Sequence, residues 1–429
     1  MAAAGKPRLK RADWLLLAIS GAMMVSWNVY SWRFPFFWDS VSHSRIATWY
    51  LETNFSSITI PEEYDAGHPP FFNLYLAMAW RLFGRTLVAA HLAMLPLLAV
   101  VLTQYHRLTM RWLSPVARPW AMLLLFCEPT YLTQAGMVSA DVGLMAFYLL
   151  ALNALLDGRR WLAVCAMLLM CAMSFRGILM AGALFITESA FSKVAGARAI
   201  GLRRMLAYAP VAILALAWLV IHHAAVGWWI SPPPETYGGQ RELLGLGGMT
   251  WNAALVGWRL ADLGRVFLWV FASVAGFSLG WAKIRSSQAS MQVLVALAAP
   301  TLLLSLLFIP FSNPVGHRYY LVSYLMLSIL AVNLAEMKGW GLKRKIGLAL
   351  VGAGLATGHW WIYPEGIAKG WDASLAHLPI FGLEERQQKY LESSHIAASE
   401  VCADFPFLHS PYYTRLIGQK QEPWMRNFL

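Results

Sequence analysis

Long apolar runs recur along the whole chain and leave few polar segments between them. Of the 429 residues, 58% are hydrophobic and 13% are charged, whereas a soluble domain carries about 25% charged residues. A run of about 20 apolar residues is the length that crosses the hydrocarbon of a bilayer as a helix. Strands of a membrane barrel would instead alternate apolar and polar residues. The sequence therefore predicts an all-α polytopic membrane protein that folds as one helical body.

We predict about eleven membrane helices from the apolar runs and the polar segments between them. Almost no loop separates the runs that meet at residues 139–141 and at residues 175–177, so we expect both joins to lie below the membrane surface. The predicted spans lie near residues 14–32, 86–105, 119–135, 142–156, 161–175, 177–191, 205–226, 264–282, 291–309, 319–336 and 346–362.

Basic residues divide unevenly between the two sides of this topology. More than half of the 34 Lys and Arg residues fall in six loops on the side of the amino terminus, at 6–11, 107–118, 159–160, 193–204, 283–285 and 338–345. Loops that stay in the cytoplasm hold Lys and Arg, so we predict a cytoplasmic amino terminus. The formal net charge of +12 is then explained by the basic residues of the cytoplasmic loops. It does not indicate a nucleic-acid surface, because the cations form no continuous stripe.

Three longer segments fall on the opposite, outer side. Residues 33–85 and 227–263 are loops within a predicted transmembrane catalytic domain of residues 1–362, and the tail 363–429 follows that domain. The first contains "PPFFNLYLAMAWRLFG", which is apolar at most positions but too short to span. We predict that it forms a helix lying in the interface plane. The tail has helical periodicity, and we expect it to pack over the outer face.

Ionisable side chains at membrane depth are costly and therefore point to function. Asp39 follows Trp38 just past the first span and is either a general base or a helix cap. Asp141 lies in "MVSADVGLMAF" and is either a helix cap or a ligand in a site. Arg176 lies between two spans with no loop to carry it into water. An ordinary surface position does not explain Arg176.

Further polar residues lie on the outer side. His68 precedes a Pro-Pro pair and either begins the interfacial helix or donates a hydrogen bond to a phosphate. His317 and Arg318 open a late span, next to Tyr319. They either extend to the membrane surface within an aromatic belt or form an anion site.

One candidate base and several cations on a single face fit the displacement of a phosphate. A phosphate departs without a general acid, so a carboxylate that takes the acceptor proton and cations that hold the departing charge are sufficient. The sequence lacks the paired carboxylates of a glycosidase, a His-Glu-x-x-His zinc site, a Walker loop and a Gly-x-Ser-x-Gly elbow. It also lacks an Asp-x-Asp motif and a dense cluster of oxygen ligands, so we assign no metal ligand and no cofactor, and metal dependence stays open.

The order of these features resembles the GT-C superfamily of membrane glycosyltransferases, nearest the branch that holds the lipid A aminoarabinose transferases and the protein O-mannosyltransferases. The resemblance spans roughly residues 14–336 and rests on "FFWDS", "HPPFFNLYLAMAWRLFG", "SADVG", "SFRG" and "HRYYLVSYLML". It implies a GT-C fold, a polyprenyl-phosphate sugar as donor, and Asp39 as the base that activates the acceptor. The chain departs from the family where it has Asp39-Ser40 in place of an acidic pair, and His68 and Arg176 in place of lysines.

We interpret the protein as an inverting glycosyltransferase of the bacterial inner membrane that moves a sugar from a polyprenyl phosphate to an acceptor hydroxyl on the outer, periplasmic face. The acceptor is a lipid, a glycan or a protein. The alternative is a transporter or flippase of a lipid-linked or anionic solute, although such a protein needs charged residues that reach both faces. A third possibility is a GT-C relative that has no catalytic activity. The expected site comprises Asp39 as base, His68, Arg176, His317 and Arg318 for the phosphate, Asp141 for a hydroxyl, and Trp38 and Tyr319 as walls for the sugar.

Overall fold

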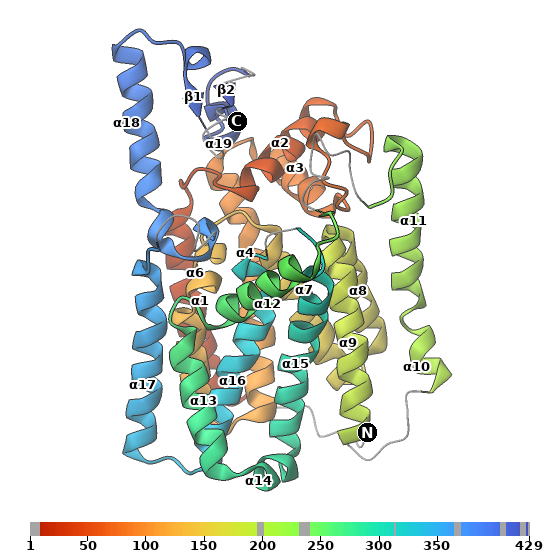
Figure 1. The fold of residues 1–429 in the computed structure, drawn as a ribbon, viewed down its shortest axis with the longest axis vertical. Coiled ribbons are helices and arrows are strands. Elements are labelled where there is room, and N and C mark those ends of the chain that lie inside the picture. The colour runs from red at the N-terminus through yellow and green to blue at the C-terminus, as the bar shows by residue number, and fades with distance from the viewer. Residues whose placement is uncertain are drawn as a thin grey trace.

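A bundle of upright helices forms most of the molecule (Figure 1). The computed structural model describes residues 9–194, 201–230, 241–312, 315–363, 370–403, 409–420 and 426–427. Each of the eleven predicted spans contains a helix of this bundle. The helices are α1 (Arg11–Ser31), α4 (Leu87–Trp112), α5 (Arg118–Cys127), α7 (Ala140–Leu156), α8 (Arg160–Met173), α9 (Phe175–Val194), α11 (Ala209–Val226), α13 (Arg265–Leu279), α15 (Gln288–Phe308), α16 (Leu321–Met337) and α17 (Leu342–Thr357).

The shorter elements lie mostly toward the upper end of Figure 1. The short helices are α2 (Asp39–Glu52), α3 (Phe71–Phe83), α6 (Pro129–Ala135), α10 (Leu202–Leu206), α12 (Leu246–Ala261), α14 (Trp281–Ser286), α18 (Pro379–Ser393) and α19 (Pro411–Thr414). The 3₁₀ turns are η1 (Glu62–Tyr64), η3 (His317–Tyr320), η4 (Gly358–Trp360), η5 (Trp371–Ala373), η6 (Leu375–His377) and η7 (Ala398–Glu400). Two-residue strands β1 (Cys402–Ala403) and β2 (Arg426–Asn427) pair in parallel.

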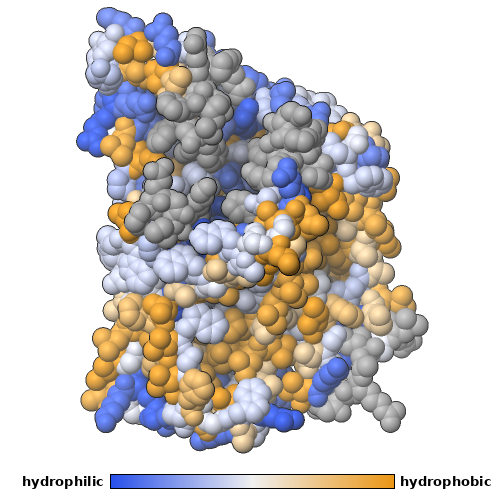
Figure 2. Space-filling view, in the orientation of Figure 1, coloured by the Kyte–Doolittle hydropathy of each residue, from blue (hydrophilic) through white to orange (hydrophobic). Residues whose placement is uncertain are grey.

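The apolar surface of the bundle fits a membrane protein. Figure 2 shows apolar side chains over the flank of the bundle and hydrophilic ones along its lower end. Among the described residues, six helices are long and apolar enough to cross a membrane, or eight if each of two bent helix pairs is one span. The bent pairs are α6 with α7, at 112°, and α12 with α13, at 83°. The fold class is confirmed, and the count of eleven crossings stays a prediction.

Helix α16 forms the centre of the bundle. Every residue from Leu321 to Ala335 is buried, which is typical of a helix that is apolar on all sides. It packs against α15 and α13, and also against α5 and α7. Because these neighbours surround the helix, the position of its first turn is fixed. That turn follows η3, which carries Arg318 and Tyr319.

The predicted span 119–135 is not a single helix. The chain bends at Glu128, between α5 and α6, because the residue before a proline is disfavoured in the helical conformation. Glu128 has φ −74° and ψ 114°, and its carboxylate accepts a hydrogen bond from the backbone N–H of Tyr131. A carboxylate that caps a helix amino terminus compensates part of the cost of its burial. The sequence prediction missed this break because the surrounding run is apolar.

The segments 33–85 and 227–263, both predicted to be outer loops, differ in how well the sequence predicted their helices. The predicted helix in residues 33–85 is present as α3, whereas its place in the interface stays a prediction. The segment 227–263 contains α12, which was not predicted and lies across the front of the bundle in Figure 1. Residues 231–240 of that segment lie outside the described residues.

The predicted cytoplasmic loops meet at one end of the bundle. Arg118 donates to Asp13 at 2.7 Å, and the backbone N–H of Ser114 donates to Glu336 at 3.2 Å. Similar ion pairs join Arg107 and Arg111 to Asp157, and Arg160 to Glu188. Residues 1–8 and 195–200 of these loops lie outside the described residues. The loops therefore share one end, and the side of the membrane that this end faces stays a prediction.

The join between α8 and α9 leaves no room for a side chain at Gly177. A Cβ atom there would lie 2.0 Å from the backbone oxygen of Met170. The N–H of Gly177 donates to the carbonyl of Ser174 at 2.8 Å. The glycine of "SFRG" thus permits the tight turn that positions Arg176.

We expect Gly177→Ala to lower the free energy of unfolding by about 1–3 kcal/mol, because the backbone must shift to admit the methyl group. Gly182→Ala on the same helix is the control, since its Cβ would lie 3.4 Å from Leu303, an ordinary contact distance. Thermal unfolding of both variants in detergent provides the measurement. Equal midpoints for the two variants would contradict this account of the turn.

Candidate active site

The beginnings of three helices and a 3₁₀ turn bring charged side chains together toward the upper end of the bundle. Asp39 is the first residue of α2, and Asp141 is the second residue of α7. Arg176 is the second residue of α9, and Arg318 lies in η3. Carboxylates at helix amino termini are favoured by the helix dipole, whereas a cation there requires an anionic partner.

Arg318 contacts three carboxylates. Its Nε donates to Asp141 at 3.0 Å, Nη1 binds Asp372, and Nη2 binds Asp39. The side chains of Arg318, Asp141 and Asp372 are 9%, 7% and 5% exposed, whereas that of Asp39 is 56% exposed. Two of the carboxylates are therefore buried against the guanidinium, and the third is open.

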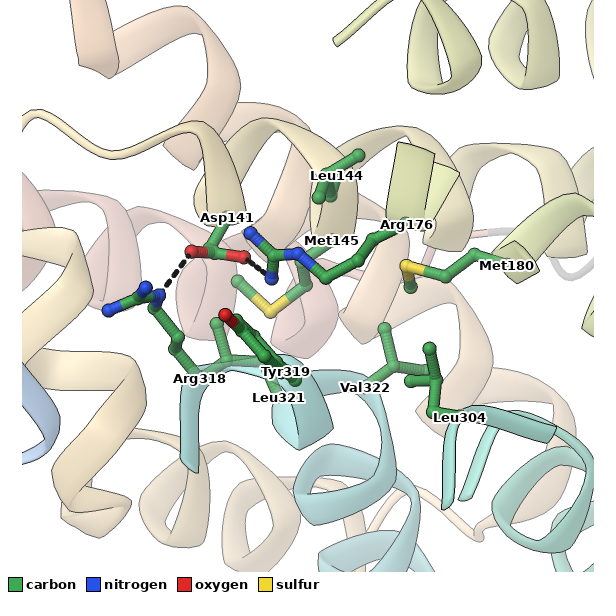
Figure 3. A pocket seen from close by; sticks show the side chains of 10 residues that line it. All are labelled: Asp141, Leu144, Met145, Arg176, Met180, Leu304, Arg318, Tyr319, Leu321 and Val322. Carbon is green, nitrogen blue, oxygen red and sulfur yellow. Dashed lines mark hydrogen bonds and ion pairs between the residues drawn. The ribbon is translucent and has the colours of Figure 1, made fainter. Parts of the chain in front are cut away.

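Asp141 joins Arg318 to a second cation. Its other oxygen accepts from Nη1 of Arg176, and Figure 3 shows Asp141 between the two arginines. The guanidinium carbon of Arg176 lies 4.0 Å from the ring centroid of Tyr319, and that of Arg318 lies 5.3 Å from it. Both arginines are thus held by charge and by contact with an aromatic ring. Three carboxylates and two guanidiniums give the cluster a formal charge of −1.

The contacts bear on the cap and surface interpretations of three of the predicted residues. Ser139 caps α7 by accepting from the N–H of Asp141 at 3.2 Å, so the carboxylate of Asp141 is not the cap. Trp38 is the residue that precedes α2, and the carboxylate of Asp39 binds Arg318. The surface interpretation of Arg318 is wrong, because its side chain is buried among carboxylates.

A cavity of about 620 Å³ adjoins this cluster, within the range of about 300–1,000 Å³ that is typical of small-molecule sites. Its polar wall includes Asp39, His68, Asn73, Gln134, Asp141, Arg176, Arg241, Arg318, Tyr319 and Asp372. Its apolar wall includes Ile178, Leu179, Trp218, Leu219, Leu307 and Phe308, from α9, α11 and α15. Charged groups and an apolar surface between membrane helices therefore line one space.

His68 lies in the cavity wall, before α3, and its ring packs edge-on against Phe175. The ring is exposed within the cavity wall, and its partial desolvation there, together with the charges of Arg176 and Arg241, lowers the pKa of His68 below its usual value. The imidazole is therefore neutral at neutral pH. It can donate one hydrogen bond to a ligand but adds no positive charge.

The structure does not bring every predicted residue to the cavity. Nε2 of His317 lies 2.7 Å from Asp262, and neither residue lines the cavity. Trp38 packs beside Phe37 and does not line it either. The six predicted residues that the cavity brings together are Asp39, His68, Asp141, Arg176, Arg318 and Tyr319. Their roles stay predictions.

Asp372 is a site residue that was not predicted from the sequence. It lies in η5 of the carboxyl-terminal segment, and Gln134 of α6 donates to its backbone carbonyl at 2.8 Å. This contact and the ion pair with Arg318 place η5 at the end of the bundle that holds Asp39, and the packing of the tail over the outer face stays a prediction. A sequence signal was present, because Trp371-Asp372 repeats the pair Trp38-Asp39.

The arrangement suits the binding of an anion next to a base. Two guanidiniums offer several N–H donors to a phosphate or carboxylate. The exposed carboxylate of Asp39 can accept a proton from a hydroxyl group. Within the described ranges, no group of three or more His, Cys, Asp or Glu side chains is arranged to hold a metal ion.

Comparison with known proteins gives matches among solved structures alone. No protein-family model matches the sequence, and no curated protein sequence matches it significantly. A crystal structure of ArnT from Cupriavidus metallidurans bound to undecaprenyl phosphate superposes with a TM-score of 0.57 over 80% of this chain, at 17% identity. The chain has the fold of ArnT. The apo structure of the same protein gives a TM-score of 0.55 over 83% of this chain, at 18% identity.

The likeness to ArnT confirms the GT-C fold that the sequence motifs predicted. The chain spans less than two thirds of the length of ArnT, because it covers 64% and 66% of the two ArnT chains. At this level of identity the likeness establishes the fold, and activity has to be argued from the cavity.

We expect His68→Gln to change how stability depends on pH. A lowered pKa in the folded protein means that the unfolded chain binds the proton more tightly, so His68 contributes more to stability above the unfolded pKa, about 6.5, than below it. The thermal midpoint of the native protein, relative to that of His68→Gln, should therefore fall between about pH 7.5 and pH 5. If the thermal midpoint of the native protein instead rises relative to that of His68→Gln as the pH falls, His68 is charged in the folded protein.

Proposed function

We propose that this protein is an inverting glycosyltransferase that moves a sugar from a polyprenyl-phosphate donor to an acceptor hydroxyl on the outer face of the membrane. The observation that carries the proposal is the cavity, where a carboxylate and two arginines adjoin an apolar wall built from membrane helices. A lipid-linked sugar phosphate has the matching chemistry: an anion, a sugar and a long apolar chain.

Arg318 and Arg176 are the proposed ligands of the donor phosphate. Arginine keeps its charge and presents a planar fork that can hold two phosphate oxygens. The same contacts stabilise the negative charge that gathers on the phosphate as it leaves. The crystal structure of ArnT bound to undecaprenyl phosphate supports a lipid phosphate as the ligand of this fold.

Asp39 is the proposed general base. Its carboxylate accepts the proton of the acceptor hydroxyl as that oxygen attacks the anomeric carbon, and the bond between this carbon and the phosphate oxygen breaks. The products are the glycosylated acceptor, with inverted configuration, and the polyprenyl phosphate. No acid is needed for the leaving group, because the phosphate is a stable anion.

The other residues of the cavity have supporting roles in this proposal. Both oxygens of Asp141 are occupied by arginines, so we assign it to aligning Arg176 and Arg318 and leave a sugar contact as a secondary role. His68 would donate to the phosphate, and Tyr319 would contact the sugar. The acceptor is a lipid, glycan or protein.

The outer face is proposed because the cavity lies away from the end of the bundle where the basic loops meet. Loops rich in Lys and Arg remain in the cytoplasm, so the charged cavity would face the periplasm if the protein lies in a bacterial inner membrane.

The test is transfer of labelled sugar by the purified full chain, given polyprenyl-phosphate sugars and a membrane lipid extract. We expect Asp39→Asn to reduce the rate about 100-fold or more, because the amide cannot accept a proton at neutral pH. Glu63→Gln is the control, since Glu63 is an exposed carboxylate of the same outer loop. A rate for Asp39→Asn within a few-fold of the control would remove Asp39 as the base.

The same assay separates the other functions. In proteoliposomes, a transporter or flippase would move labelled lipid across the bilayer without forming a new glycosidic bond. A protein without activity would do neither, with any donor in the panel. Covalent transfer to an acceptor supports the glycosyltransferase alone.

A further inference from the structure

The three carboxylates on Arg318 differ in how firmly they are held. Asp141 and Asp372 are buried, with side chains 7% and 5% exposed. Asp39 is 56% exposed. Because the three carboxylates differ in exposure, the free-energy cost of breaking their ion pairs with Arg318 also differs.

The two buried partners are fixed by further contacts. Asp141 binds Arg176 through its second oxygen, and Asp372 is fixed by the hydrogen bond from Gln134 to its backbone. Releasing either carboxylate from Arg318 would leave a buried charge with fewer partners, which is strongly unfavourable. Asp39 can leave by rotating its side chain into the open cavity, where water solvates it. An incoming anion can therefore displace Asp39 most readily.

We propose that Asp39 occupies, in the resting protein, the anion site on Nη2 of Arg318 that the donor phosphate takes when it binds. The inference rests on the proposed function and specifies where on Arg318 the phosphate binds. One phosphodiester replaces one carboxylate, so the charge around the guanidinium does not change. Asp141 and Asp372 keep Arg318 in place during the exchange, which makes Asp372 a positioning residue of the carboxyl-terminal segment.

The exchange links binding of the donor to activation of the base. While Asp39 binds Arg318, one oxygen of its carboxylate is occupied by the guanidinium and is not available to an acceptor hydroxyl. Once the phosphate takes Nη2, the carboxylate is free and lies next to the donor that supplies the anomeric carbon. The base is thus available when a donor is present, and the donor binds before the acceptor loses its proton.

The test is the affinity of the purified full chain for undecaprenyl phosphate, a ligand that cannot react. We expect Asp39→Asn to bind it about 3- to 10-fold more tightly than the native protein, because an internal competitor has been removed. Asp39→Glu keeps the competing charge and should bind like the native protein. Glu63→Gln should also bind like the native protein, which controls for the loss of one negative charge on the outer loop.

The outcomes distinguish this inference from the function on which it rests. If the native protein binds undecaprenyl phosphate and Asp39→Asn binds it equally well or more weakly, the exchange is wrong, but the proposed class of donor is not contradicted. If neither protein binds, the donor class is wrong and the exchange fails with it. Measurements at about 0.15 M salt, where charges are screened over about 8 Å, limit long-range effects.

A structure of the native protein with undecaprenyl phosphate gives a second, independent test. We expect phosphate oxygens on Nη2 of Arg318, with Asp39 turned away and the pairs of Arg318 with Asp141 and Asp372 intact. Release of Asp372 in place of Asp39, or a phosphate bound away from Arg318, would overturn the proposal.

Discussion

A buried guanidinium that three carboxylates share is the interaction on which the rest of the site depends. Arg318 is 9% exposed in a protein whose surroundings are apolar, and such a charge persists there only with anionic partners. Its partners come from α2, α7 and η5, which are far apart in the sequence. The need to neutralise Arg318 therefore ties α2 and the carboxyl-terminal segment to the bundle.

A second buried ion pair supports the position of Asp372. The side chain of Arg265 is fully buried and donates from Nε to Glu128 at 2.8 Å, with its guanidinium carbon 3.6 Å from the ring of Tyr324. Glu128 also caps α6, and Gln134 near the other end of α6 binds the backbone of Asp372. Contacts from the core helices thus reach η5 through α6. Loss of either partner in the Arg265–Glu128 pair would leave a buried charge and shift this helix.

The features that follow from local sequence could be predicted. Apolar runs identified the helices of the bundle, and an ionisable residue within an apolar context identified Asp39, Asp141, Arg176 and Arg318. Asp372 was missed because a carboxylate in a polar tail costs nothing until the tail packs, and packing is not a local property. The bend at Glu128 was missed for a different reason, because the apolar run around it obscured the local signal of the following proline.

The sequence also could not predict which way each side chain of a turn points. His317 and Arg318 are adjacent, and both were expected at the phosphate. In a 3₁₀ turn, successive side chains point about 120° apart. One of them reaches the cavity, and the other binds Asp262 outside it. Which of the two faces the cavity depends on how η3 sits on α16, and the sequence does not show that.

The measurement that tests the role of Arg318 most directly compares Arg318→Met with Arg241→Met. Both arginines line the cavity, but Arg241 donates to the backbone of Ala66 and lies outside the carboxylate cluster. For folded, monodisperse protein, we expect Arg318→Met to weaken binding of undecaprenyl phosphate and to slow a single turnover, with a combined loss of about 2–5 kcal/mol, and Arg241→Met to have a smaller effect on both. Equal effects of the two substitutions, or unchanged binding and turnover in Arg318→Met, would contradict the account.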